Sequence, residues 1–306
     1  MATFLPEAVS LVEVGLRDGF QNESLVVPTD RKLSIIAQLA EAGLRHIQAA
    51  SFVHPGKVPQ MADADDLVRR LPRGDGVAYS ALVLNQRGLN RAMAADIRNV
   101  EISLSASDSH SRRNTGMSRQ EALAQGARMV DTALSAGLHV RTSVQCAFGC
   151  VYEGAVPVGR IKDIISRLAD HGAHELSLAD TTGMGTPAAL SAVLDVVVPV
   201  CGPLPVALHL HDTRGLGLVN LMTAMQYGIS IFDTALAGMG GCPFVHGAAG
   251  NIATEDTVHL LDSLEITSGV DYRRVSTIAV EMETLFHKSF PGRIHRVMAS
   301  LNLPIL

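Results

Sequence analysis

Residues 175–211 read ELSLADTTGMGTPAALSAVLDVVVPVCGPLPVALHLH, with two apolar runs on either side of a longer helical stretch. Glu175–Ala179 and Val206–His211 have the length and apolar content of buried strands. Pro187–Val200 is long enough for a helix, and Pro187 stands where a helix can begin. The order strand, helix, strand predicts two parallel strands with the helix packed outside them.

The same alternation continues in both directions along the chain. Six further strands are expected at Leu11–Leu16, His46–Phe52, Val77–Val83, Val100–Ala106, Val140–Ala147 and Ile231–Ala237, with helical stretches that include Asp30–Ala42, Ser118–Ala136 and Val158–Gly172. Ser118 and Glu121 have the spacing of a capping box, which predicts a helix start there. Eight strands favour a closed (β/α)8 TIM barrel over an open doubly wound sheet, which needs only about five to seven.

No linker or low-complexity tract interrupts the 306 residues, so we expect one catalytic TIM-barrel domain over residues 1–306. Two or three further helices are expected after Gly250, up to about His287. They predict a C-terminal helical extension from about residue 265 that covers one end of the barrel.

The composition excludes several classes of protein. A net charge of −5 provides no basic surface for nucleic acid. No apolar run reaches the roughly 18 residues of a membrane span, and the first ten residues lack the basic and apolar regions of a secretory signal. The four cysteines, in a chain of this length, are typical of reduced thiols. A cytoplasmic enzyme is therefore expected.

Strand Val206–His211 carries the first chemical signal. His209 and His211 are two positions apart, so their side chains point to the same face of the strand, at the carboxyl end where TIM barrels hold their active sites. Two buried imidazoles require partners. Either a divalent cation satisfies both of them, or they are core histidines hydrogen-bonded to neighbouring polar groups.

Two other strand ends add polar groups on the same rim. Arg17 and Asp18 follow the first strand; Asp18 can supply an anionic ligand, although an Arg–Asp pair alone is usually a salt bridge. The glycine-rich loop after Ile231–Ala237 contains Cys242 and ends at Asn251, whose carbonyl oxygen can complete a ligand set or whose side chain can simply cap the next helix. Nitrogen and oxygen ligands without thiolate favour Mg²⁺ or Mn²⁺ over Zn²⁺.

Five segments resemble 3-hydroxy-3-methylglutaryl-CoA lyases, in the same order and at compatible spacing. They are residues 12–23 (VEVGLRDGFQNE), 146–150 (CAFGC), 177–183 (SLADTTG), 209–213 (HLHDT) and 240–256 (GGCPFVHGAAGNIATED). The last segment is highly specific to these lyases. The wider superfamily of such barrels includes isopropylmalate synthases and biotin carboxyltransferases.

The resemblance implies a retro-Claisen cleavage of a 3-hydroxyacyl-CoA into acetyl-CoA and a keto acid by a homo-oligomer, as in the dimers of this family. It matches the metal ligands to Asp18, His209, His211 and Asn251, and the group that stabilises the acetyl-CoA enolate to Arg17. It matches the loop thiol of proton transfer to Cys242. Asp180 matches a catalytic residue near the site, while Gln21 and Glu255 match supporting residues, Gln21 on the substrate side.

The chain departs from these lyases at positions that bear on the substrate. Gln48 stands where the lyases usually carry Glu, and Ser24 where they usually carry a basic residue. Arg214 is expected to pair with a substrate carboxylate or with Asp212. The neighbouring Arg112 and Arg113 either meet CoA phosphates or remain on the solvated surface. The reaction class is kept, but a related thioester such as (R)-citramalyl-CoA stays open beside 3-hydroxy-3-methylglutaryl-CoA.

Three other functions agree less well with the sequence. A condensing synthase of the isopropylmalate type usually carries a C-terminal regulatory domain, which has no counterpart here. A biotin-dependent carboxyltransferase needs a lysine at a strand end, whereas Lys32, Lys57, Lys162 and Lys288 fall in helices or loops. A catalytically inactive scaffold is disfavoured by the complete set of site residues.

Overall fold

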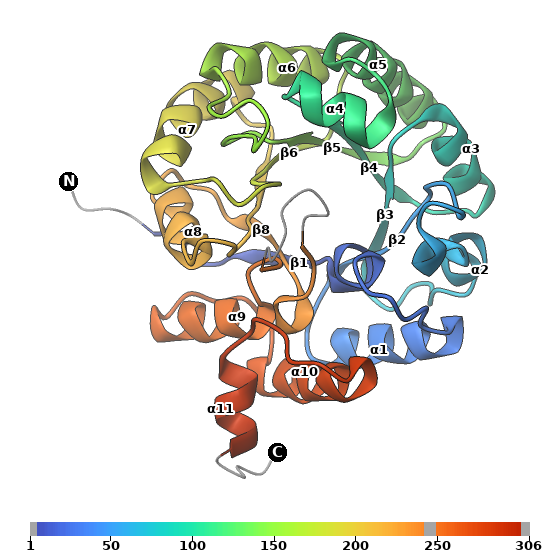
Figure 1. Cartoon of the computed structure of the whole chain (residues 1–306), viewed down its shortest axis with the longest axis vertical. Helices are drawn as coiled ribbons and strands as arrows, with labels where there is room; N and C mark the ends of the chain where they lie inside the picture. Colours follow the sequence, from blue (N-terminus) through green and yellow to red (C-terminus); the bar gives the residue numbers. More distant parts are fainter. Residues whose placement is uncertain (1–4, 242–248, 301–306) are drawn as a thin grey trace.

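Eight parallel strands form a closed barrel in the computed structural model, which describes residues 5–241 and 249–300 (Figure 1). The strands are β1 (Ser10–Glu13), β2 (His46–Ser51), β3 (Ala78–Val83), β4 (Asn99–Ser105), β5 (His139–Gln145), β6 (Glu175–Ala179), β7 (Val206–His209) and β8 (Ile231–Thr234). Each strand pairs with the next, and β8 pairs with β1. The predicted TIM barrel is confirmed.

A ring of helices surrounds the strands (Figure 1). Its members are α1 (Thr29–Glu41), α2 (Ala64–Arg69), α3 (Gln86–Ala94), α4 (Asp108–Thr115), α5 (Arg119–Ser135), α6 (Val158–Asp170), α7 (Pro187–Cys201), α8 (Gly217–Met225) and α9 (Thr254–Ser263). Helix α6 shows why they form, because it buries Ile161, Ile164, Ile165 and Leu168 along one stripe against the sheet. The capping box of Ser118 and Glu121 is confirmed at the start of α5.

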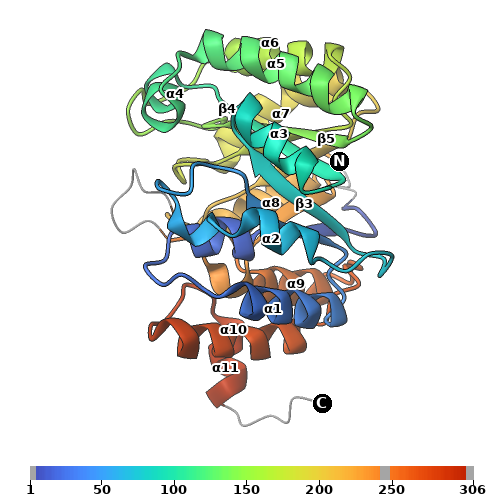
Figure 2. The ribbon, with the colours of Figure 1, turned by 90° about the vertical axis from the view of Figure 1, so that its right-hand side faces the viewer.

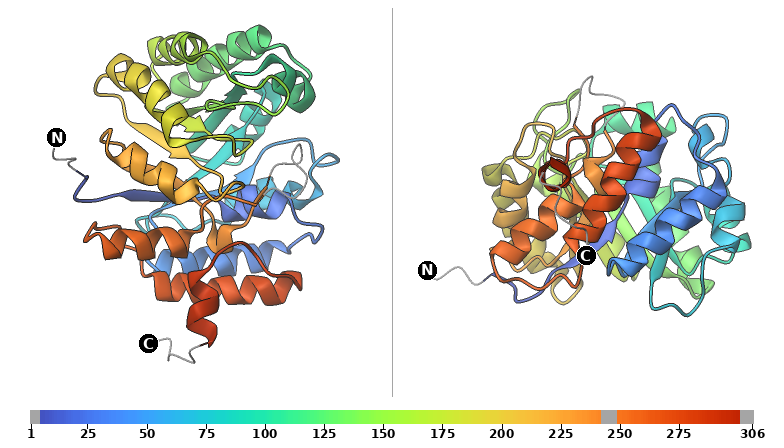
Figure 3. Two further views of the ribbon diagram at one scale, coloured as in Figure 1. Left: turned by 60° about the vertical axis from the view of Figure 1, so that its left-hand side comes forward. Right: turned by 90° about the horizontal axis from the view of Figure 1, so that it is seen from below.

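The C-terminal helices pack beside the barrel. Helix α9 completes the ring after β8, α10 (Tyr272–Phe286) packs against α9 and α1, and α11 (Ile294–Ser300) packs against α10 and α9 (Figures 2 and 3). The extra helices are confirmed, but the expectation that they cover one end of the barrel is wrong. None of the helices among the described residues is both long enough and apolar enough to cross a membrane.

Among the strands that end two or three residues earlier than predicted, β1, β7 and β8 shape the carboxyl rim at the site. Strand β1 ends at Glu13, and Gly15–Gly19 (η1) forms a single π-helical turn. The Glu13 carboxylate causes this, because Oε1 accepts hydrogen bonds from the backbone N–H of Gly15 at 2.7 Å and of Leu236 at 2.9 Å. Strand β8 ends at Thr234 and is followed by a 3-10 turn at Leu236–Gly238 (η3).

Strand β7 ends at His209, although the sequence pattern continues to His211. Instead of continuing the ladder, His211 forms an isolated antiparallel bridge with Asn251. The neighbouring backbone bonds, Ile252 N–H to Leu210 O at 3.1 Å and Asp212 N–H to Gly250 O at 3.0 Å, hold the two segments together. The chain after β8 therefore returns to the end of β7, which brings distant parts of the sequence to one place.

Candidate active site

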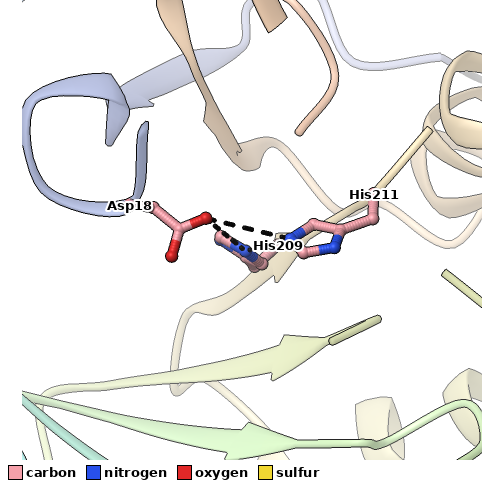
Figure 4. A group of neighbouring side chains, drawn as sticks. All are labelled: Asp18, His209 and His211. Atoms are coloured by element: carbon pink, nitrogen blue, oxygen red, sulfur yellow. Dashed lines mark hydrogen bonds and ion pairs between the residues drawn. The ribbon is translucent and has the colours of Figure 1, made fainter. Parts of the chain in front are cut away.

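Asp18, His209 and His211 meet at the mouth of the barrel (Figure 4). The Nε2 atoms of His209 and His211 lie 3.1 Å apart, and Asp18 Oδ2 lies 4.0 and 3.9 Å from them. All three residues are buried. Two neighbouring ligands of an octahedral ion, each about 2.2 Å from it, are separated by about 3.1 Å. The geometry of this cluster fits a divalent cation.

Asn251 lies beside the cluster through its bridge to His211. Its Nδ2 donates to Asp18 Oδ2 at 2.8 Å and to Met239 O at 3.0 Å. Its Oδ1 is buried and has no hydrogen-bond partner among the described residues, so an acceptor oxygen is left for a fourth ligand. Helix α9 begins only at Thr254 after an N-cap at Ala253, so the alternative that Asn251 merely caps this helix is wrong.

The charges of the cluster favour a cation over a pair of core histidines. Burial, with a smaller effect of neighbouring His209, lowers the pKa of His211 to about 3, so its imidazole is neutral and can act as a ligand. Burial alone would raise the pKa of Asp18, but Arg17, His209, His211 and the Asn251 amide together hold it below its ordinary value. His211 Nδ1 has no partner within the described part of the chain, unlike a satisfied core histidine.

Arg17 and Gln21 lie directly beside these groups. Arg17 donates from Nη1 to Asp18 Oδ1 and from Nε to Gln48 Oε1, and Gln21 Nε2 donates to Asp18 Oδ1 at 3.0 Å. Both Arg17 and Gln21 line the cavity, whereas Gln48 is buried behind Arg17. The positive charge of Arg17 therefore faces the same space as the ligand cluster.

The cavity at this mouth has a volume of about 290 Å³. Asp18, His209 and His211 form one side of it. The wall opposite contains polar side chains of β4, β5 and α4, including Glu101, Ser103, His110, Asn114, Ser143 and Gln145. A polar wall facing a cation site suits a small substrate with several oxygen atoms.

Asp180 and Arg214 do not line this cavity either. Asp180 accepts a hydrogen bond from the backbone N–H of Gly185 at 2.9 Å, and burial raises its pKa to about 6. Arg214 donates from Nη1 to the carbonyl oxygens of Thr182 and Gly183, at 3.0 and 2.5 Å. Its predicted pairing with Asp212 is wrong. Both residues shape the turn after β6, within the described residues.

Three further predicted residues are Arg112, Arg113 and Cys242. Arg112 forms an ion pair with Asp108 at 2.7 Å, and the guanidinium of Arg113 lies over the ring of Tyr152, so both side chains have a partner within the protein. Cys242 lies outside the described residues, as does most of its loop.

Sequence reasoning missed three charged residues inside the barrel: Glu101, Arg141 and Asp233, all of which are buried. Asp233 Oδ2 accepts from His209 Nδ1 at 3.1 Å and so orients the ring of a proposed ligand. The signal was present in the sequence, because each is a charged residue within a run predicted to be a strand of a parallel sheet, which is usually apolar throughout.

Comparisons with known proteins agree with this geometry. The HMGL-like family model matches residues 8–281. The chain is 41% identical over 271 residues to the cytoplasmic 3-hydroxy-3-methylglutaryl-CoA lyase of Rattus norvegicus, covering 89% of this chain and 79% of the relative. The solved HMG-CoA lyase of Bacillus subtilis has a TM-score of 0.92 and 39% identity, covering 96% and 99%. An HMG-CoA lyase of Acinetobacter baumannii, solved with coenzyme A and 3-methylmalate, has a TM-score of 0.91 and 32% identity, covering 95% of each chain.

Proposed function

The chain belongs to the HMGL-like family of carbon–carbon lyases, and on this premise we propose that it cleaves 3-hydroxy-3-methylglutaryl-CoA to acetyl-CoA and a keto acid. The observation that carries the proposal is the position of Arg17 beside the Asp18, His209 and His211 cluster, at the wall of one cavity. This arrangement offers a cation site for chelating oxygens and a fixed guanidinium for negative charge that develops during bond cleavage.

We propose that Asp18, His209, His211 and Asn251 hold the divalent ion. Their nitrogen and oxygen atoms favour Mg²⁺ or Mn²⁺ over Zn²⁺. Such an ion, when bound, polarises the substrate's oxygen atoms as a Lewis acid and orients them. Asp233 supports the site by accepting a hydrogen bond from Nδ1 of His209, which leaves Nε2 for the ion.

Several residues of the chain contribute to separate steps of the reaction. The 3-hydroxyl loses its proton to a base, which is Asp18 or a neighbouring group near the metal, and a carbonyl forms at C3 as the C2–C3 bond breaks. The electron pair of that bond passes to the acetyl-CoA fragment as its enolate, whose oxygen meets Arg17. Protonation at C2 completes acetyl-CoA, and we assign this proton to the Cys242 thiol because of the resemblance of its loop. Asp180 and Arg214 are proposed to shape the turn after β6 rather than to contact the substrate.

A panel of thioesters tests this function and its substrate. We expect acetyl-CoA release from 3-hydroxy-3-methylglutaryl-CoA, with (R)-citramalyl-CoA as the competing substrate left open by Gln48. The condensing synthase is not favoured, because the relatives are lyases. Treatment with EDTA should abolish the release, and Mn²⁺ or Mg²⁺ should restore it. Full activity in metal-free protein would refute the metal site.

The setting of the enzyme is also proposed. We expect an acyl-CoA substrate, a cytoplasmic location, a homo-oligomer such as a dimer, and one catalytic domain over residues 1–306 with its helical extension from about residue 265. Relatives whose names include "cytoplasmic" support the location, although others are named as mitochondrial. Sedimentation of the purified protein tests the oligomeric state.

A further inference from the structure

A closed circuit of buried side chains runs beneath the proposed metal site. It starts at Arg17, whose Nε donates to Gln48 Oε1, and continues from Gln48 Nε2 to Glu101 Oε2 at 2.9 Å. Arg141 lies 3.6 Å from Glu101 through its Nε and donates from Nη2 to Asp233 Oδ1 at 2.8 Å. Asp233 binds His209, and His209 lies 4.0 Å from Asp18, which accepts from Arg17.

The barrel fixes these positions. Glu101 and Arg141 are register partners across β4 and β5, and His209 and Asp233 are register partners across β7 and β8. Glu101 is 4% exposed, Arg141 8% and Gln48 1%, so their mutual contacts are largely shielded from bulk water. The groups on both sides of the proposed metal site therefore depend on each other for orientation.

Gln48 supplies the amide of this circuit, between Arg17 and Glu101. A guanidinium can only donate hydrogen bonds and an ionised carboxylate can only accept them, whereas an amide does both. The Glu101 carboxylate accepts a hydrogen bond from the NH₂ group of the Gln48 amide, so the amide oxygen is left to accept one from Arg17. If the amide turned over, its NH₂ group would face the N–H of Arg17, and both buried donors would lose their partner.

Balancing the charge of Arg141 does not by itself explain Glu101. Arg141 already lies 2.8 Å from Asp233 and 3.1 Å from Glu175, and both distances are shorter than the 3.6 Å to Glu101. The short contact of Glu101 is the one to Gln48. The specific effect of Glu101 is therefore to fix the orientation of the Gln48 amide.

We propose that Glu101 is a positioning residue: it fixes the Gln48 amide so that its oxygen holds the Arg17 guanidinium at the cavity wall. The proposal rests on the proposed function, because Arg17 is the group that meets the enolate. Its chemical consequence is that the pair at positions 48 and 101 must contain one amide and one carboxylate. Two carboxylates would repel each other, and two amides would leave the direction of the Arg17 contact unfixed.

Three variants test this pairing: Gln48→Glu, Glu101→Gln and the double variant Gln48→Glu/Glu101→Gln. We expect kcat to fall about 100-fold in Gln48→Glu and about 10-fold in Glu101→Gln, with little change in KM, because Arg17 acts on the transition state. The double variant reverses the hydrogen bond and should recover to within about 5-fold of the parent, far above the value for independent effects.

Glu175→Gln is the matched control, because Glu175 also contacts Arg141 but not Gln48. It should change kcat by less than about 2-fold and should not rescue Gln48→Glu. A double variant as slow as Gln48→Glu, or a Glu175→Gln variant as slow as Glu101→Gln, would overturn the proposal.

An NMR measurement separates this proposal from the proposed function. In protein labelled with ¹⁵Nε-arginine, the Arg17 Nε–H signal, assigned by its loss in Arg17→Lys, should broaden or shift in Glu101→Gln and return in the double variant. It should stay unchanged in Glu175→Gln. An unchanged Arg17 signal in Glu101→Gln would reject the positioning role whatever thioester is cleaved, whereas an inactive parent with the expected NMR changes would reject only the function.

Discussion

Two buried carboxylate–imidazole pairs among the described residues have different surroundings. His209 Nδ1 lies 3.1 Å from Asp233, and His295 Nδ1 lies 2.8 Å from Glu255. The other ring nitrogen of His209 faces His211 and the cavity. The other nitrogen of His295 lies 3.3 Å from Glu283, and its ring has no exposed surface. Only the first pair leaves a nitrogen available to a ligand.

The second pair instead stabilises the turn after β8. Glu255 Oε2 accepts from the backbone N–H of Ala237, which has a φ of 59°, and the N–H of Gly292 donates to Ala237 O at 2.8 Å. A positive φ is costly for alanine, so these bonds from α9 and the chain before α11 hold a conformation that the turn would not adopt alone. Access to the cavity, rather than residue type, therefore distinguishes a histidine that can bind a metal from one that only stabilises the fold.

Removing the cavity-facing imidazole should have the largest effect. We expect His209→Ala to weaken Mn²⁺ binding by at least about 100-fold and to abolish measurable lyase activity, because one ligand and its contact to Asp233 are both lost. His171→Ala is the control, since His171 pairs with Asp131 near the surface. Calorimetric titration with Mn²⁺ checks this; equal losses in both variants would contradict the ligand assignment.

Changing the carboxylate of the same pair should have a smaller effect. In Asp233→Asn the neutral amide orients His209 less strongly and leaves Arg141 with one carboxylate fewer, so Mn²⁺ affinity should fall about 10- to 100-fold. The titration used for His209→Ala measures it. Wild-type affinity in a correctly folded Asp233→Asn protein would show that this contact does not support the metal site.

The pair of His295 and Glu255 should affect stability and not catalysis. We expect His295→Gln to reduce the free energy of unfolding by about 3 kcal/mol, because it leaves the buried Glu255 without its imidazole partner. Folded protein should keep its Mn²⁺ affinity and kcat within about 2-fold. Urea denaturation measures the free energy of unfolding, and calorimetric titration and steady-state kinetics measure Mn²⁺ affinity and kcat. Loss of metal binding in the folded variant would show that this pair, too, supports the metal site.

Another buried carboxylate, that of Glu13, is held by Thr254 and by backbone N–H groups, and burial raises its pKa to about 7 from an ordinary 4.5. The folded state therefore retains a proton that the unfolded chain has released between these pH values, so this contribution to stability is full below pH 4.5 and is lost as the pH rises through 7. Glu13→Gln should remove about 2 kcal/mol of the pH dependence between pH 5.5 and 8. Thermal unfolding at both values checks it; an unchanged pH dependence would contradict the assignment.

Patterns of residues within single segments predicted the strands and helices of the barrel well. Strands β2, β3 and β6 begin and end within one residue of the predicted limits, because their apolar runs coincide with the residues that pair in the sheet. The ends of β1, β5, β7 and β8 were predicted two or three residues too late. The ends of β1, β7 and β8 depend on Glu13 binding Leu236 and on the bridge between His211 and Asn251, and neither contact is visible in a local pattern.

The order and types of residues by themselves determined the alternating architecture, the rim on which Asp18, His209 and His211 lie, and the resemblance to a lyase family. Only the tertiary structure decided which polar residues act together. It joined Gln48 to Glu101 and separated Asp180 and Arg214 from the cavity. It also left one ring nitrogen of His209 facing the cavity, whereas both ring nitrogens of His295 lie next to carboxylates. The physical reason is that hydrogen bonds and burial depend on distances across the barrel, which spacing along one strand does not specify.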